Sequence, residues 1–154
     1  MEALASLGEI YCNVSLDGFS PESHGKFRGD KDSFQKTVST IRELAQHRLL
    51  QGLLVTPNNL AEVDEYSKLC EFAIENGATY VLMNPLSSMG RGVKSVGKLA
   101  MPSEVMRQIE ASTSQFSDRI QLVKIRFPND RKLPLASCEA GNIVYVFTHG
   151  ELTV

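Results

Sequence analysis

Residues suited to chemistry gather in segment 11–29, YCNVSLDGFSPESHGKFRG. The segment carries a carboxylate on Asp17, an imidazole on His24 and a guanidinium group on Arg28. A loop with such groups could hold a polar ligand, but Asp-Gly pairs such as Asp17-Gly18 also form turns that bind nothing. The pattern alone leaves both interpretations of Asp17 open. We interpret His24 as an exposed loop residue and not as a general base.

A repeated alternation of strands and helices must position these side chains. Short apolar runs predict buried strands at residues 10–16, 49–55 and 78–83. Strand 10–16 alternates partly between apolar and polar residues, as a barrel strand with one face toward a ligand cavity would. Helices with one apolar face are predicted from about residue 32, over 60–75 and from about residue 103. A further strand is predicted over 120–127.

Strand–helix alternation implies a sheet of parallel strands joined by right-handed crossovers. Ligands of such sheets bind at the carboxyl ends of the strands. The loops after Leu16, Val55 and Met83 therefore share one end of the predicted sheet. We expect a common rim there, formed by Asp17, Arg28, Asn58 and Asn84.

Capping residues predict where two of the helices begin. Asp32 can accept a backbone hydrogen bond at the start of its helix while Gln35 reaches back, which is a capping-box arrangement. Asn59, with Glu62 three residues later, predicts the same arrangement for the helix over 60–75.

The composition excludes two classes of partner. The 154 residues carry 16 basic and 18 acidic side chains, mixed along the sequence, and a formal net charge of −2. Nucleic-acid binding requires a basic stripe that is missing here. No apolar run reaches the roughly 18 residues of a membrane span, and the N-terminus has no pattern of a secretory signal. We therefore expect a cytoplasmic protein without nucleic-acid or membrane partners.

The three cysteines, Cys12, Cys70 and Cys138, are far apart in the sequence. No Cys-x-x-Cys pair occurs, and no histidine stands at zinc-ligand spacing from any of them. We expect no disulfide framework. We interpret Cys12 and Cys70 as small buried apolar residues.

Several short motifs together resemble one family, the radical SAM enzymes. The motifs are SLDG at 15–18, PESH at 21–24, FRG at 27–29, GA at 77–78 and GRG at 90–92. Residues 1–118 look like the fourth, fifth and sixth strand–helix units of such an enzyme. The resemblance implies an α/β fold: half of an open (β/α) TIM-like barrel with parallel strands, which holds S-adenosylmethionine at their carboxyl ends.

The resemblance implies roles for five residues in binding S-adenosylmethionine. Ser15 and Asp17 would form hydrogen bonds with the ribose hydroxyl groups, and the guanidinium of Arg28 would bind the methionine carboxylate. Met83 and Asn84 would flank the adenine through backbone atoms. Gly25 departs from the family pattern, in which an aspartate often follows the histidine.

The C-terminal segment carries a second resemblance. Cys138 with the following Glu-Ala-Gly, the apolar run 143–147 and the His149-Gly150 turn look like the opening of the auxiliary-cluster domain called SPASM. The resemblance implies that Cys138 ligates an iron–sulfur cluster. Residues 143–147 and 152–154 predict a β-hairpin. We therefore divide the chain into the half barrel over 1–118, a strand and linker over 119–137, and the start of an auxiliary-cluster domain over 138–154.

The sequence also departs from the family. It lacks the Cys-x-x-x-Cys-x-x-Cys motif that holds the catalytic four-iron cluster, the segment that grips the methionine amino group, and the first three barrel strands. We therefore expect an internal piece of a longer protein. This piece would be inactive alone, would hold neither a complete S-adenosylmethionine site nor a complete iron–sulfur cluster, and would self-associate through its half barrel.

The resemblance implies the activity of the intact parent. It would cleave S-adenosylmethionine to a 5′-deoxyadenosyl radical, for peptide modification or cofactor maturation, with a peptide or small molecule as substrate. An alternative stays open, in which the chain is a stand-alone α/β module that binds a nucleotide-like ligand without redox chemistry.

Overall fold

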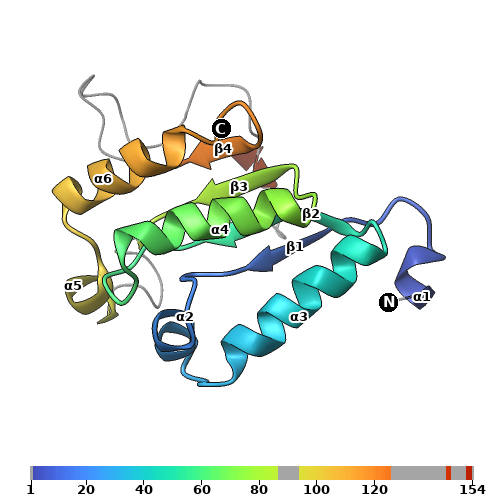
Figure 1. The fold of residues 1–154 in the computed structure, drawn as a ribbon, viewed down its shortest axis with the longest axis horizontal. Helices are drawn as coiled ribbons and strands as arrows, with labels where there is room; N and C mark the ends of the chain where they lie inside the picture. The colour runs from blue at the N-terminus through green and yellow to red at the C-terminus, as the bar shows by residue number, and fades with distance from the viewer. Residues whose placement is uncertain (1, 87–93, 126–144, 147–151, 154) are drawn as a thin grey trace.

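The computed structural model of the chain describes residues 2–86, 94–125, 145–146 and 152–153. Four parallel strands form one sheet in the order β1-β2-β3-β4 (Figure 1). They are β1 (Cys12–Ser15), β2 (Leu50–Val55), β3 (Tyr80–Met83) and β4 (Gln121–Lys124). This arrangement confirms the predicted α/β fold with parallel strands, and it is consistent with part of an open TIM-like barrel.

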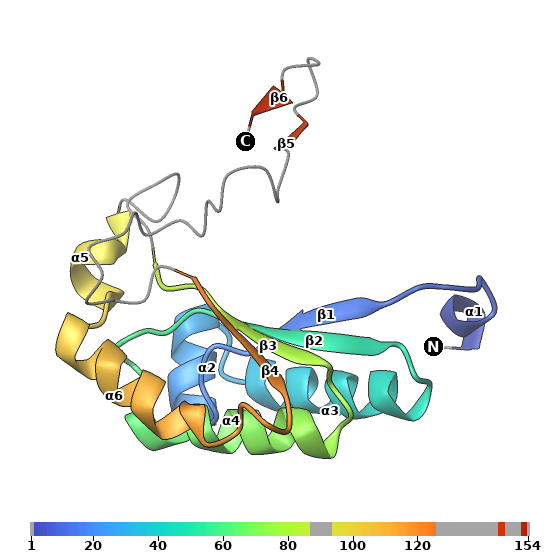
Figure 2. The same ribbon diagram turned by 90° about the horizontal axis from the view of Figure 1, so that it is seen from above.

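Helices cover one side of this sheet. The described helices are α1 (Glu2–Ala5), α2 (Pro21–Arg28), α3 (Ser33–Gln46), α4 (Val63–Glu75), α5 (Val96–Leu99) and α6 (Ser103–Ser114). In Figure 2, α2, α3, α4 and α6 lie on the same side, and no described helix covers the other. We call the uncovered side the open face.

The strand register assigns side chains to the two faces, because successive residues of a strand point in opposite directions. One row of aligned residues belongs to the core or packs against it: Val14, Leu53, Val81 and Leu122. The neighbouring row therefore points to the open face: Asn13, Gly52, Tyr80 and Gln121. The row after the core row, Ser15, Leu54, Leu82 and Val123, also points to the open face.

Helix periodicity supplies the other half of the core. α3 buries Val38, Ile41 and Leu44, spaced three apart as the predicted apolar stripe requires. α4 buries Leu69 and α6 buries Ile109, both without exposed surface. Each such side chain stabilises the fold by about 1.5–3 kcal/mol relative to an exposed position. This packing fixes the strands, and therefore the loops at their carboxyl ends, in place.

Both predicted capping arrangements are wrong. Asp32 does precede α3, but its backbone is already helical and its side chain forms no capping hydrogen bond. Its N–H donates a hydrogen bond to Asp30 Oδ1 at 2.9 Å. α4 begins at Val63, later than predicted, and its capping box is formed by Glu62 and Glu65. A capping residue typically has an extended backbone conformation, which Glu62 has and Asp32 lacks.

The C-terminal strands β5 (Tyr145–Val146) and β6 (Leu152–Thr153) pair antiparallel, which confirms the predicted hairpin. The GRG motif at 90–92, Cys138 and the His149-Gly150 turn lie outside the described residues. None of the helices that the structure describes combines the length and apolar character needed to cross a lipid bilayer.

Candidate functional site

The segment after β1 forms a helix where the sequence predicted only a polar loop. Ser20 caps the N-terminus of α2 through a hydrogen bond from Ser23 N to its Oγ at 3.1 Å, and Pro21 occupies the first turn. Gly29 closes α2 in the left-handed conformation, with φ of 72°. The helix therefore places Arg28 in its last turn, beside the carboxyl end of β1.

Gly18 and Gly25 allow α2 to pack closely. A Cβ at Gly18 would overlap the side chain of Ser23, and a Cβ at Gly25 would lie 3.2 Å from the carbonyl oxygen of Asp30. Gly25, where the family often has an aspartate, thus stands at a position with little room for a side chain. Because α2 packs closely at both glycines, Ser23 and His24, which lie between Gly18 and Gly25 in the sequence, are buried.

Asp17 is buried, with 1% of its surface exposed, and it links two loops of the rim. Its Oδ1 accepts a hydrogen bond from Thr56 N, in the loop after β2, at 2.8 Å. Its Oδ2 lies 2.5 Å from Arg28 Nη2, although no hydrogen bond of good geometry to Oδ2 forms among the described residues. The carboxylate therefore positions Arg28 and the loop after β2.

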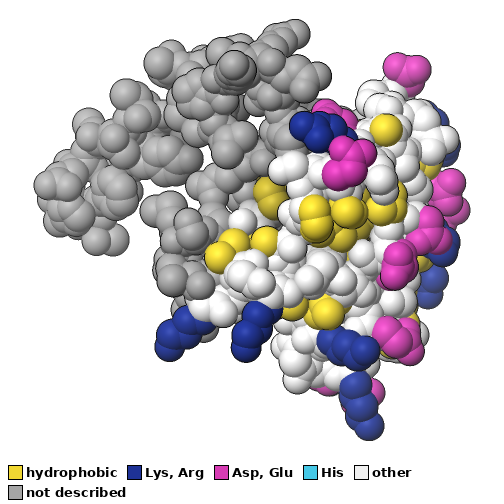
Figure 3. Space-filling model, turned by 90° about the vertical axis from the view of Figure 1, so that its left-hand side faces the viewer, with side chains coloured by type: hydrophobic (Ala, Val, Ile, Leu, Met, Phe, Trp, Pro, Cys, Tyr) yellow, Lys and Arg dark blue, Asp and Glu magenta, His cyan; other side chains and the backbone are white. Residues whose placement is uncertain are grey.

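Arg28 presents its guanidinium group at the rim. Its side chain is 41% exposed, whereas the side chain of its partner Asp17 is 1% exposed. A guanidinium group has five N–H donors, so the contact with Asp17 leaves others free for an anion. Figure 3 looks onto this end of the molecule, where basic, acidic and apolar side chains share the described surface.

His24 is also buried, with 1% of its surface exposed, so the prediction of an exposed loop residue is wrong. Its Nδ1 accepts a hydrogen bond from Asp17 N at 3.1 Å, and its Nε2 lies 3.3 Å from Thr37 Oγ1 on α3. Burial lowers the pKa of His24 below its ordinary 6.5, and Arg28 acts in the same direction, while Asp17 opposes both. No histidine is visible on the described part of Figure 3.

Asn58 joins the first two loops from inside, with no exposed surface. Its Nδ2 donates to the carbonyl oxygen of Asp17 at 2.7 Å and to that of Thr56 at 2.9 Å. The hydroxyl of Tyr66 accepts from Asn58 N at 3.0 Å, and burial raises the pKa of that hydroxyl. The prediction placed Asn58 on the rim, and the structure places it behind the rim as a support.

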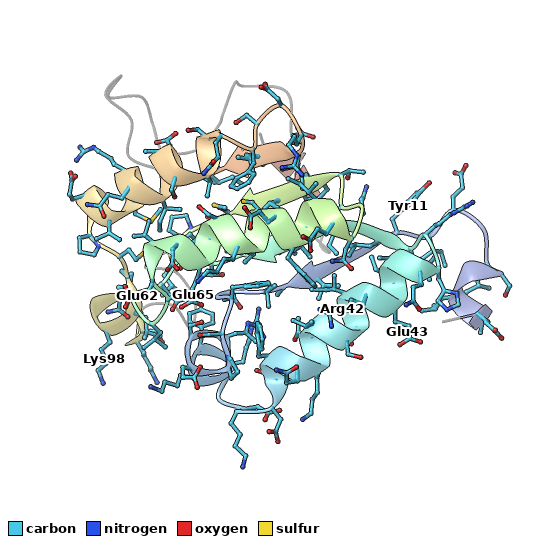
Figure 4. All side chains as sticks on the ribbon, viewed as in Figure 1. Tyr11, Arg42, Glu43, Glu62, Glu65 and Lys98 are labelled. Atoms are coloured by element: carbon cyan, nitrogen blue, oxygen red, sulfur yellow. The ribbon has the colours of Figure 1, made fainter. Side chains whose placement is uncertain are left out.

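Glu65 is a second buried support, and sequence reasoning missed it. Figure 4 shows Glu62 and Glu65 at the N-terminal end of α4. Glu65 Oε2 accepts from Phe19 N and from Ser23 Oγ, both at 2.5 Å, and Oε1 accepts from Glu62 N at 3.2 Å. The Glu-x-x-Glu spacing could have indicated a capping box, but nothing in the sequence indicates the contact with α2.

The remaining predicted ligands lie elsewhere on the rim, and among the described residues no side-chain hydrogen bond or ion pair joins them to this network. Ser15 is half-buried and points to the open face, as the register requires. Met83 is fully buried, and its carbonyl oxygen accepts from Ile125 N at 2.9 Å. Asn84 is exposed, and its N–H donates to Val55 O at 2.9 Å. Within the described ranges, the Asn84 carbonyl and side chain form no hydrogen bond.

The cysteines of the described residues do not form a metal site. Cys70 is buried in the core, and burial raises the pKa of its thiol to about 12, so it stays protonated. Cys12 is half-buried at the start of β1. No group of three His, Cys, Asp or Glu side chains that could hold a metal ion occurs within the described ranges. These described residues therefore fit no iron–sulfur cluster.

Comparison with known proteins supports the family resemblance. The sporulation killing factor maturation protein SkfB of Bacillus subtilis (strain 168) is 26% identical over 125 residues, which cover 80% of this chain and 30% of SkfB. The antilisterial bacteriocin subtilosin biosynthesis protein AlbA of the same strain is 28% identical over 138 residues, 86% of this chain and 29% of AlbA. No protein-family model matches the chain.

A third relative, the AdoMet-dependent heme synthase of Methanosarcina barkeri (strain Fusaro / DSM 804), is 33% identical over 97 residues, 62% of this chain and 27% of the synthase. All three are radical SAM enzymes of the SPASM or twitch type, so the resemblance to this family is confirmed. The chain spans less than a third of the length of each of these relatives.

Proposed function

We propose that this chain forms one wall of an S-adenosylmethionine site in a radical SAM enzyme that acts on a peptide. The half-exposed guanidinium of Arg28, held at the strand ends by the buried carboxylate of Asp17, is the observation that carries the proposal. Three radical SAM relatives support it. Two of them act on peptides, which favours a peptide substrate over the maturation of a cofactor.

Each residue of the wall has a separate task in this proposal. The free N–H donors of Arg28 bind the methionine carboxylate as a fork, a geometry that a lysine cannot offer. The hydroxyl of Ser15 lies on the open face and the carbonyl of Asn84 at its edge. In this proposal they bind hydroxyl and amino groups of S-adenosylmethionine. Asp17 binds no ligand directly when its carboxylate faces Arg28; it orients the guanidinium instead.

The radical chemistry would come from groups that the described residues do not supply. When bound next to a reduced iron–sulfur cluster supplied by other residues, S-adenosylmethionine would provide a 5′-deoxyadenosyl radical for hydrogen abstraction. The contribution of the described residues is to bind the carboxylate, fix its orientation and keep water from the polar groups behind the rim. Cys138 remains a proposed ligand of an auxiliary cluster.

Calorimetric titration of S-adenosylmethionine into the full-length protein, under anaerobic conditions, tests this function. We expect Arg28→Ala to weaken binding by about 10–100-fold, because it removes charge-assisted hydrogen bonds to a carboxylate. Lys26→Ala removes an exposed charge from the same helix and should change the affinity less than about twofold.

Arg28→Lys separates binding from folding. It keeps a positive charge beside the buried carboxylate of Asp17 but loses the fork, so the protein should stay folded and still bind at least about fivefold more weakly. Equal affinity of wild type, Arg28→Ala and Lys26→Ala would show that Arg28 does not contact the ligand.

A further inference from the structure

His24 occupies a central place behind the rim. It lies on α2, one turn before Arg28, and its ring reaches back to the end of β1. Phe34 packs against the ring with centroids 6.3 Å apart, and Thr37 on the same helix contacts the far nitrogen. A single side chain thus connects β1, α2 and α3.

The contacts of His24 define one protonation state. A backbone N–H can only donate, so Nδ1, which faces the N–H of Asp17, must carry a lone pair. In a neutral ring the proton then sits on Nε2, which donates to Thr37 Oγ1. A protonated ring would carry a hydrogen on both nitrogens and would lose the bond to Asp17 N.

We propose that His24 is a positioning residue for S-adenosylmethionine: its neutral imidazole fixes the backbone of Asp17, and thereby the Asp17–Arg28 ion pair that presents the guanidinium to the ligand. The inference rests on the proposed function, because the ligand is the one assigned to Arg28 above. His24 itself touches no ligand. It acts through a bond of 3.1 Å to Asp17 N and through the ion pair of 2.5 Å beyond it.

The charged groups that act on His24 determine what protonation would do. They are Asp17 at the end of β1 and Arg28 at the end of α2, while α3 contributes the neutral Thr37 and Phe34. An imidazolium ring would be attracted to the Asp17 carboxylate and repelled by Arg28. It would therefore compete with Arg28 for Asp17 and displace the guanidinium from its place at the rim.

Two substitutions separate this role from packing alone. His24→Asn retains an acceptor, because Asn Oδ1 stands close to the position of His Nδ1, but it cannot titrate. His24→Leu fills part of the space and removes the acceptor. His47→Asn is the matched control, since His47 follows the C-terminus of α3 and is remote in sequence from the rim residues.

The experiment is a calorimetric titration of S-adenosylmethionine into the full-length protein from about pH 8 down to the lowest pH at which circular dichroism shows the native fold. At about pH 8 we expect His24→Asn and His47→Asn to bind within about twofold of wild type, and folded His24→Leu to bind about fivefold or more weakly. Below pH 6.5 the wild type and His47→Asn should lose affinity more steeply than His24→Asn.

Several results would overturn the inference. Folded His24→Leu that binds like wild type would do so, as would His24→Asn that loses as much affinity as His24→Leu, or pH slopes that are equal in all four proteins. A wild type that binds no S-adenosylmethionine at any pH overturns the proposed function, and the inference with it. The first three results leave wild-type binding intact, so the two failures can be told apart.

Discussion

The two sides of the sheet at its carboxyl end are built in different ways. Behind the rim, on the side of the helices, buried polar groups are paired within the chain: Asp17, His24, Asn58 and Glu65. On the open face the polar contact is exposed, where Tyr80 donates to Asn13 Oδ1 at 2.8 Å across Gly52. The rim is thus held from behind by paired buried groups, while no described helix covers its front.

The two sides differ in how their polar groups are satisfied: by partners within the chain behind the rim, and with access to water on the open face. A buried polar group must be paired, and each unpaired one costs about 1–3 kcal/mol. Pairing of these buried groups therefore favours one arrangement of the network. Through its ion pair with Asp17, Arg28 is held in a fixed position by that arrangement. Exposed groups such as Asn13 can bond to water instead, so the open face tolerates change.

Glu65→Ala should break the network behind the rim and give the largest loss of stability. It leaves Phe19 N and Ser23 Oγ without their acceptor, so we expect a loss of about 2–4 kcal/mol in the free energy of unfolding. Urea denaturation measures it. The control, Asp64→Ala, breaks an exposed ion pair with Lys68 and should cost far less. Similar values for both variants would show that the buried contacts of Glu65 stabilise the fold no more than an exposed ion pair does.

Gly52→Ala tests the open face and should have a smaller effect. The new Cβ would lie 2.7 Å from the ring of Tyr80, which must move and lose its bond to Asn13. We expect a loss of about 1–2 kcal/mol in the wild type. Because the obstacle is a side chain, the same substitution should cost less in a Tyr80→Ala background, and a double-mutant cycle measures the coupling. Purely additive losses would show that Tyr80 does not lie over Gly52.

The sequence predicted the sheet well, because its strands are short apolar runs between clear breaks. Residues 49–55 and 78–83 enclose β2 and β3. α2 escaped prediction because Pro21 and Gly25 are typical of turns, and a helix with weak amphipathic character leaves no periodic signal. Ser20 as N-cap, Pro21 in the first turn and Gly29 after the last turn are local helix signals that the prediction did not use.

The candidate site was predictable only in part. Arg28 and Asp17 could be placed on one rim because the ends of parallel strands meet there, and the structure joins them. The burial of His24 could not be predicted, since its environment is made by Phe34 and Thr37 from the next helix. Self-association of the half barrel, the role of Cys138 and the division into domains remain predictions.

The most direct measurement is a crystal structure of the full-length protein with S-adenosylmethionine bound. The proposed function predicts that the methionine carboxylate lies within about 3.2 Å of the guanidinium nitrogens of Arg28, with Asp17 still paired to the other side of that group. A carboxylate bound elsewhere, with Arg28 contacting only Asp17, would contradict the central claim that this rim is the wall of the S-adenosylmethionine site.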